Sequence, residues 1–341
     1  MAASASRYDR QIRLPQIGAD GQAALRRASV AVIGLGALGS HGADLLARAG
    51  VGRLILIDRD VVEWSNLQRQ SLYDERDAER ARPKAEAAAE RLRAVNADVE
   101  LTVQLADLSA HNAPRLLHGA TLLLDGTDNF ATRYLLNDFS VQQRVAYVYA
   151  GVVSTYGLVG AVVPDGPCLR CTYPEPPDAA NTPTCQSAGV FGPAVAVVAG
   201  LAAGEALKIA SGNPRSAHAG FRYVDLWSGE SRALGARQDP DCPCCGRRDF
   251  EWLEGRRGAP RAQALCGGGA VQLPGGEAAP DLAALGRKLQ GTVGDLEVRE
   301  RYLRFRDNGL ELTLFADGRA LVRGTEDPAA ARALLARTVG A

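Results

Sequence analysis

The sequence predicts an α/β fold, a Rossmann-like open, largely parallel sheet with helices on both faces, followed by a small C-terminal α+β module. Short apolar runs rich in β-branched residues alternate with helical stretches along the first part of the chain, as in βαβ units. The first run ends in closely spaced glycines and continues into a helix. Toward the end of the chain, short alternating strands and two helical stretches form a separate pattern.

The individual elements follow from apolar periodicity and from the glycines and prolines that bound it. Helices are expected at 19–27, 40–49, 84–95, 130–144, 190–210, 281–289 and 328–338, and strands at 29–33, 53–58, 99–105, 120–125, 146–149, 157–163, 221–227 and 271–273, with three more between 296 and 322. The predicted domains are 1–250 and 265–341. The charged, glycine-containing segment 251–264 is predicted to be a linker.

Three glycines follow the strand at 29–33, namely Gly34, Gly36 and Gly39, with Ala37 between the last two. The first glycine permits a tight turn, the second lets a phosphate approach the backbone, and the third lets the helix pack closely on the strand. The free N–H groups at the helix start then face an anion. This stretch predicts a nucleotide-binding turn but does not distinguish a dinucleotide from ATP.

The next strand ends in Asp58, roughly 20 residues beyond the glycines. An acidic side chain at this place can accept hydrogen bonds from ribose hydroxyls. The alternative is a solvated carboxylate at a strand end. We predict the ribose role.

The segment 60–70 is predicted to be a loop beside the phosphate site, and it contains Ser65, Asn66 and Arg69. Lys84 opens the next helix directly after Pro83. Because a helix N-terminus favours anions, a lysine there indicates that something negative lies close by.

Asp128 and Asn129 follow the strand at 120–125 and precede a helix. The carboxyl ends of parallel strands line the crevice of an open sheet, where ligands bind. The sequence therefore predicts that these side chains face the nucleotide.

Composition excludes several classes of function. The 341 residues, with 46% hydrophobic and 23% charged residues, are typical of a soluble protein with about two domains. Lys+Arg and Asp+Glu both number 39, so no global field attracts nucleic acid or an anionic membrane. The first residues lack an apolar leader, and the longest apolar stretch, 190–203, is too short for a bilayer. We expect a cytoplasmic protein.

Four of the seven cysteines form two CxxC pairs, Cys168 with Cys171 and Cys242 with Cys245. This spacing predicts a four-thiolate structural Zn²⁺ site. A redox pair is one alternative, and Cys244 in place of a neighbouring ligand is another.

Cys185 follows a proline-rich segment and precedes an apolar helix. A helix N-terminus can lower the pKa of a thiol and make it a nucleophile. We expect a catalytic role for Cys185, with an idle thiol as the alternative. Cys266, which precedes three glycines, is expected to be structural or incidental.

The residue types favour ATP over nicotinamide chemistry. None of the four histidines stands at a strand end, whereas an ATP site needs cations around a triphosphate, a carboxylate for Mg²⁺ and a ribose anchor. These types are present at Arg10, Arg69, Lys84, Asp128 and Asp58.

In their order along the chain, these motifs resemble the MoeB/ThiF family, the bacterial adenylyltransferases of the ubiquitin-activating superfamily. The resemblance covers about Arg7 to Gly246. It is carried by RYDRQ, GLGALG, the acidic strand end at Asp58, SNLQRQ, the helix-opening Pro83-Lys84, DGTDN, the two CxxC pairs and TCxxAGV. An ordered set of this kind is far more specific than a glycine pattern alone.

The resemblance implies adenylation of the C-terminal glycine of a small ubiquitin-fold sulfur-carrier protein that ends in Gly-Gly, with release of pyrophosphate. ATP and Mg²⁺ are then required, and Zn²⁺ is structural. Matching motifs assign the ribose to Asp58, the Mg²⁺ to Asp128 and its surroundings to Asn129. The phosphate contacts fall to Asn66, Arg69 and Lys84, with Ser65 counted among the nucleotide-binding residues.

Arg10 matches an arginine that in the family reaches the neighbouring subunit's site, which implies a homodimer; a surface salt bridge is the alternative. Cys185 matches a position that accepts the activated carrier in some members only. The C-terminal module departs from relatives with a rhodanese domain, because no cysteine follows Cys266. The other readings are a non-catalytic scaffold subunit and a NAD-dependent oxidoreductase.

Overall fold

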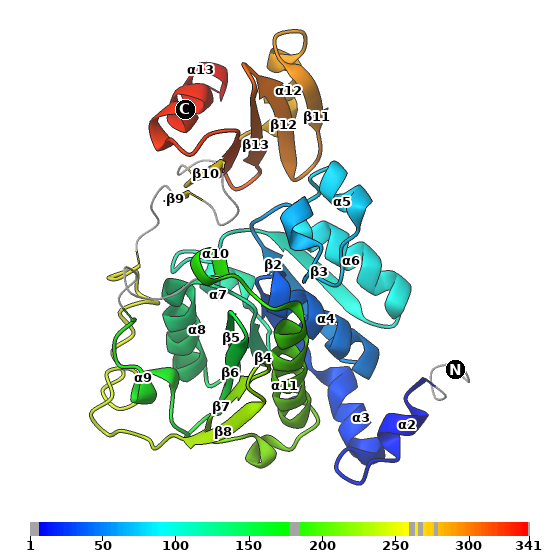
Figure 1. Cartoon of the computed structure of the whole chain (residues 1–341), viewed down its shortest axis with the longest axis vertical. Helices are drawn as coiled ribbons and strands as arrows, with labels where there is room; N and C mark the ends of the chain where they lie inside the picture. Colours follow the sequence, from blue (N-terminus) through cyan, green and yellow to red (C-terminus); the bar gives the residue numbers. More distant parts are fainter. Residues whose placement is uncertain (1–6, 178–184, 259–262, 265–268, 276–278, 340–341) are drawn as a thin grey trace. The chain divides into compact units, whose positions relative to one another are not determined.

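The computed structural model describes residues 7–177, 185–258, 263–264, 269–275 and 279–339. The chain divides into two compact units, Met1–Gly258 and Ala259–Ala341 (Figure 1).

The first unit is built on an eight-stranded sheet of order β3-β2-β1-β4-β5-β6-β7-β8. The strands β1 to β5 are parallel, and β6, β7 and β8 each run antiparallel to the preceding strand. Their bounds are β1 Ser29–Ile33, β2 Arg53–Asp58, β3 Glu100–Leu105, β4 Leu122–Asp125, β5 Ala146–Val153, β6 Tyr156–Val162, β7 Gly220–Asp225 and β8 Glu230–Gly235. The strand order reverses between β1 and β4, the place where ligands bind in open sheets.

Helices cover both faces of this sheet (Figure 1). Their bounds are α2 Asp9–Ile12, α3 Gly18–Arg27, α4 Ala37–Ala49, η1 Trp64–Asn66, α5 Glu75–Glu79, α6 Lys84–Val95, α7 Ala113–Leu116, α8 Phe130–Gln143, α9 Leu169–Thr172, α10 Cys185–Ala188, α11 Gly192–Ala210 and η2 Pro214–Ser216. One core packs α3, α4, α6 and α11 on the sheet, and the other packs α7, α8 and α9 on the opposite face. The predicted α/β class is confirmed.

Helix α11 is the one described helix long and apolar enough to cross a membrane by length and composition. In this fold it packs on β5, β6 and α4. Its side chains Val195, Val198 and Ala202 are buried in the core of that face. The helix therefore has the position of a core helix.

The predicted elements recur with shifts of a few residues, and the exceptions have physical reasons. β5 is longer than expected and β6 is shifted by one residue, and the two strands form an antiparallel hairpin across Ser154, which has a positive φ of 53°. β8 was not expected, because its residues are exposed along an edge and show no apolar alternation.

The segment 251–264 was expected to be a linker, but its first part belongs to the first unit. Trp252 is buried against Tyr134, with ring centroids 5.1 Å apart. The Asp138 carboxylate accepts the backbone N–H of Trp252 at 3.0 Å, and the buried Arg170 pairs with Glu251 at 2.9 Å. The division therefore falls after Gly258, because one buried aromatic residue and one buried ion pair hold this stretch.

The second unit is a six-stranded antiparallel sheet of order β11-β12-β13-β14-β10-β9. Its elements are β9 Gln263–Ala264, β10 Ala270–Leu273, α12 Leu282–Leu289, β11 Gly294–Val298, β12 Tyr302–Asp307, β13 Leu310–Phe315, β14 Ala320–Arg323 and α13 Pro328–Val339. α12 and α13 help to enclose its own apolar core. Four strands therefore overlap 296–322, where three were expected, because mostly exposed β11 carries little apolar signal.

Candidate nucleotide site and cysteine cluster

The glycine turn lies at the carboxyl end of β1, against the turn that follows β4. Gly34 has a φ of 79°, and a Cβ there would lie 2.9 Å from backbone atoms of Gly126. A Cβ on Gly39 would lie 1.8 Å from the Gly34 carbonyl oxygen. Two of the predicted glycines are thus required by close backbone packing.

Asp58, at the end of β2, holds the glycine turn from the side. Its Oδ2 accepts the Leu35 N–H at 2.6 Å, and its Oδ1 accepts the Asp60 N–H at 2.7 Å. The Tyr73 hydroxyl donates to the Leu35 carbonyl at 2.8 Å. Burial raises the pKa of Asp58, an effect that nearby Lys84 opposes.

Lys84, at the start of α6, is buried with its Nζ 3.4 Å from Asp60 Oδ2. Burial works against its charge, but Asp60 and Asp58 outweigh this effect, so the pKa of Lys84 lies above its usual value. Asp128 adds to the same electrostatic field. The structure therefore places a permanent cation among the carboxylates at this sheet edge.

Arg59 is a charged residue at this edge that the sequence interpretation missed. Its Nη1 lies 3.1 Å from Asp107 Oδ2, and Asp60 and Asp128 both raise its pKa against the effect of burial. The signal was present, since Arg59 stands between two acidic residues at a strand end.

The predicted loop 60–70 contains the short 3₁₀ turn η1. Asn66 is buried and its Oδ1 accepts the Glu63 N–H at 3.1 Å, while its Nδ2 lies 3.4 Å from Ser65 Oγ. The half-buried Arg69 donates to the Ser65 carbonyl at 2.6 Å. Gln70 is buried, and its Nε2 lies 3.9 Å from where a Cβ of Gly36 would be. This loop therefore borders the glycine turn.

The turn after β4 carries the exposed Asp128. Asn129 caps α8, because its side chain accepts the Thr132 N–H at 2.8 Å. Asp128 makes no ion pair among the described residues, although Arg59, Lys84 and Arg133 feel its charge. An exposed carboxylate among cations remains open to a ligand.

Arg10 lies on α2, away from this chain's own glycine turn. Gln11 beside it donates to the Ala49 carbonyl at 2.9 Å, at the last residue of α4. The glycine turn stands at the other end of α4, about 20 Å distant for a helix of this length. The exposed Arg10 is the one predicted ATP-site cation that the fold does not bring to the site.

Cys185 is the first residue of α10, and its side chain lies outside the described residues. The backbone after α10 is fixed to the end of β5, since Ser154 N–H donates to the Gly189 carbonyl at 2.9 Å. Cys266 also lies outside the described residues.

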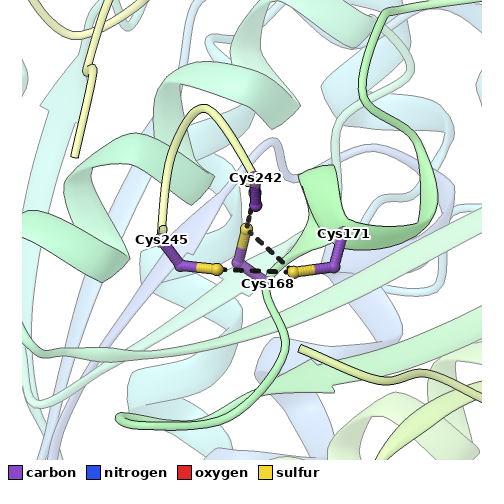
Figure 2. Close-up of side chains that lie close together, drawn as sticks. All are labelled: Cys168, Cys171, Cys242 and Cys245. Carbon is purple, nitrogen blue, oxygen red and sulfur yellow. Dashed lines mark hydrogen bonds between the residues drawn. The ribbon is translucent and has the colours of Figure 1, made fainter. Parts of the chain in front are cut away.

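The four predicted thiol ligands gather into one cluster (Figure 2). The Sγ atoms of Cys168 and Cys242 are 3.6 Å apart, those of Cys171 and Cys245 are 3.3 Å apart, and all four lie within 4.8 Å of one another. Tetrahedral Zn²⁺ with Zn–S bonds of about 2.3 Å needs sulfur separations of about 3.8 Å. The residues therefore fit a four-thiolate metal site that joins α9 to the segment after β8.

Cys244 is buried beside this cluster but is not one of its four members. The Asn137 side chain of α8 donates to Cys244 Sγ at 3.2 Å and accepts the Leu169 N–H at 2.8 Å. Asn137 thus links the segment of Cys244 to the segment of Leu169, which carry the two CxxC pairs. This arrangement gives Cys244 a hydrogen-bonding role next to the four clustered thiols.

Comparison with known proteins agrees with this geometry. The ThiF family pattern matches residues 8–244. A sulfur carrier protein ThiS adenylyltransferase from Bacillus subtilis is 39% identical over 339 residues, which cover 98% of this chain and 99% of the relative. A sulfur carrier protein adenylyltransferase from Thermus thermophilus is 41% identical over 248 residues, 70% of this chain and 90% of the relative.

A crystal structure of E. coli MccB has a TM-score of 0.62 at 24% identity, over 70% of this chain and 75% of that chain, and supports the fold. The family pattern spans more than half of the chain, and the B. subtilis relative aligns along nearly all of it. The protein belongs to the ThiF family.

Proposed function

We propose that the protein uses ATP to adenylate the C-terminal glycine of a ubiquitin-like sulfur-carrier protein, releasing pyrophosphate. One observation carries this proposal. The glycine turn, Asp58, Lys84 and Asp128 meet at the carboxyl edge of the sheet in a chain similar, along nearly its whole length, to a sulfur carrier protein ThiS adenylyltransferase.

The proposed reaction is attack by the carrier's carboxylate oxygen on the α-phosphorus of ATP. A P–O bond forms to the carrier, and the bond to pyrophosphate breaks. Because two anions must meet, catalysis depends on positioning and charge neutralisation. Lys84 supplies a buried positive charge that its neighbours maintain, and Arg69, beside the glycine turn, supplies a second.

Asp58 and Asp128 have different proposed tasks. Asp58 orients the glycine turn and faces the ribose, whereas Asp128, exposed and without an ion pair among the described residues, would hold Mg²⁺. Carboxylate together with phosphate oxygens is a donor set that suits Mg²⁺, which would neutralise phosphate charge when bound. The proposed contacts of Ser65, Asn66 and Asn129 with the nucleotide rest on their places around the same turn.

The cysteine cluster is proposed to hold structural Zn²⁺, because four thiolates close a tetrahedral site and leave no open position for a substrate. Metal analysis by mass spectrometry should find about one zinc per chain. Cys185 is proposed to accept the activated carrier, and Cys185→Ala that leaves downstream sulfur transfer intact would remove this role. We also infer a cytoplasmic enzyme.

The test is ATP–pyrophosphate exchange with candidate carriers that end in Gly-Gly. Exchange that requires a carrier, ATP and Mg²⁺ supports the proposal, and an inactive Lys84→Ala variant is the matched control. A zinc-loaded protein that binds ATP but exchanges with no carrier would instead indicate a non-catalytic scaffold. Tight binding of a nicotinamide dinucleotide would favour an oxidoreductase.

Arg10 is proposed to act in the partner subunit's site of a homodimer, since it lies far from its own glycine turn. Arg10→Ala and Asp128→Ala should each abolish exchange. In a re-equilibrated equimolar mixture, half of the dimers contain one intact site, so about one quarter of the activity should return. No recovery, despite mixed dimers seen by native mass spectrometry, would exclude action across the interface.

A further inference from the structure

Arg133, on the first turn of α8, is a buried cation that the proposed reaction does not use directly. Its Nη2 donates to the Thr127 carbonyl at 2.8 Å and lies 3.3 Å from the Ala150 carbonyl, and its Nη1 lies 3.4 Å from the Tyr149 hydroxyl. The guanidinium carbon lies 5.0 Å from the Phe130 ring centroid and 4.9 Å from that of Tyr149. These two aromatic rings and three oxygen acceptors together fix the plane of the Arg133 guanidinium.

Asp125, the last residue of β4, binds the same turn through its carboxylate. Its Oδ1 accepts the Thr127 N–H at 2.8 Å and the Thr127 hydroxyl at 2.7 Å. Its Oδ2 accepts the Tyr147 hydroxyl at 2.7 Å and lies 3.8 Å from Arg133 Nε. Asp125 and Arg133 together bind the amide, the hydroxyl and the carbonyl of Thr127.

The residue after Thr127 is Asp128. On its other side, Asn129 is fixed as the cap of α8. Gly126 lies so close to the glycine turn that its Cβ would stand 2.3 Å from the Gly34 carbonyl oxygen. Asp128 is therefore an exposed carboxylate between two immobilised neighbours, on a turn packed against the nucleotide-binding backbone.

We propose that Arg133 is a positioning residue, which sets the distance between the Asp128 carboxylate and a divalent cation carried by the nucleotide phosphates. The inference rests on the proposed function, because that function assigns the metal to Asp128. A forked, planar guanidinium can donate to the Thr127 carbonyl through Nη2 and to the Tyr149 hydroxyl through Nη1 at once. A lysine ammonium has a single nitrogen and cannot keep this geometry.

The test compares Arg133→Lys with Arg144→Lys, since Arg144 stands just after the end of α8 and pairs with Asp165 on the surface. Binding of Mn²⁺ to the full chain with a non-hydrolysable ATP analogue is measured by electron paramagnetic resonance. Arg133→Lys should weaken Mn²⁺ binding about tenfold, as loss of a supporting contact around a metal ligand does. Arg144→Lys should match the wild type.

In pyrophosphate exchange, Arg133→Lys should raise the half-saturating Mg²⁺ concentration by a similar factor, with less effect on KM for ATP at saturating Mg²⁺. A variant that melts earlier but keeps wild-type Mn²⁺ affinity would overturn the proposal, because a purely structural residue behaves in that way. Should Arg133→Lys not fold, Tyr147→Phe removes one bond to Asp125 and must shift Mn²⁺ affinity in the same direction.

The metal measurement needs no carrier, so it separates this inference from the proposed function. A wild-type protein that binds Mn²⁺ and nucleotide but catalyses no exchange would end the adenylation proposal and leave the positioning role standing. If the wild type catalyses exchange and Arg133→Lys binds Mn²⁺ as tightly as the wild type, the adenylation proposal would stand and the positioning role of Arg133 would be refuted.

Discussion

The buried carboxylates Asp58 and Asp125 hold the backbone of the site's turns in place and do not form surface ion pairs. Asp58 accepts two backbone N–H groups beside the glycine turn, and Asp125 accepts one, together with two hydroxyls. A buried carboxylate with several donors is strongly directional and costly to leave unpaired. Each turn of the site is therefore held by a carboxylate that stands at the end of the preceding strand.

In the second unit, Glu297 allows the contribution of one charged side chain to stability to be tested. Partial burial works to raise the pKa of Glu297, but Arg299 at 2.8 Å and Arg304 at 2.5 Å outweigh it, and the pKa lies below its usual value. The charged form thus stabilises the fold above the unfolded-state pKa of about 4.3, and this stability is lost as pH falls through the lower folded-state value.

We expect Glu297→Gln to lower the free energy of unfolding of the second unit by about 0.5–1 kcal/mol at pH 7. The difference from wild type should shrink as the pH falls below about 4.3, which urea unfolding followed by circular dichroism can measure. The exposed neighbour Glu300 supplies the control, because Glu300→Gln should change little at either pH. A constant difference across this pH range would contradict the argument.

At the scale of elements, the two turns of the site fit together through glycine. Gly126 contacts the backbone of Gly34 and Gly39, so no side chain can stand between the β1 and β4 turns. The elements that carry the turns are rigid, since β1 and β4 are adjacent parallel strands with completely buried residues. The spacing of glycine turn and Asp128 is therefore a property of the sheet.

Gly126→Ala should destabilise the first unit by about 1–3 kcal/mol, because the added methyl group overpacks a backbone contact. It should also weaken ATP binding, measured by calorimetry, since the glycine turn must move. Gly200→Ala is the matched control, because Gly200 is exposed in α11 with open space around its Cβ position. That change should raise stability by about 0.5–1 kcal/mol. Equal effects of the two substitutions would refute the packing argument.

At the scale of the whole molecule, the two units have separate cores, and the first ends later than its motifs suggest. Phe250 and Trp252 belong to the core around α8, and Glu251 and Arg257 continue the ion-pair network of Arg170. The cysteine cluster is thus followed by a short tail that the first unit needs.

A chain ending at Gly258 should therefore fold on its own, whereas one ending at Gly246 should melt about 10 °C lower or more. The shorter chain loses a buried tryptophan and leaves Arg170 without Glu251, changes that each cost several kcal/mol. Thermal unfolding followed by circular dichroism compares the two directly. Similar melting temperatures would show that the tail adds nothing to the core.

Local sequence was sufficient to predict the fold class, most of the elements, the four cysteines of the cluster and several residues around the glycine turn. These follow from local patterns, because a glycine pattern, a strand-end acid and a CxxC pair each require only a few neighbouring residues. β8 and the tail at 250–258 have no such pattern, since an exposed edge strand and a charged segment with one tryptophan resemble loops in sequence.

The interactions between the charged residues follow from the folded chain and not from local sequence. The tertiary structure brought Arg59 beside Asp107, separated Arg10 from its own glycine turn, and enclosed Arg133 beneath the turn that bears Asp128. The physical reason is the same in each case. A charge gains its partners and its pKa from groups distant in sequence, and those distances are fixed only when the strands of the sheet are in register.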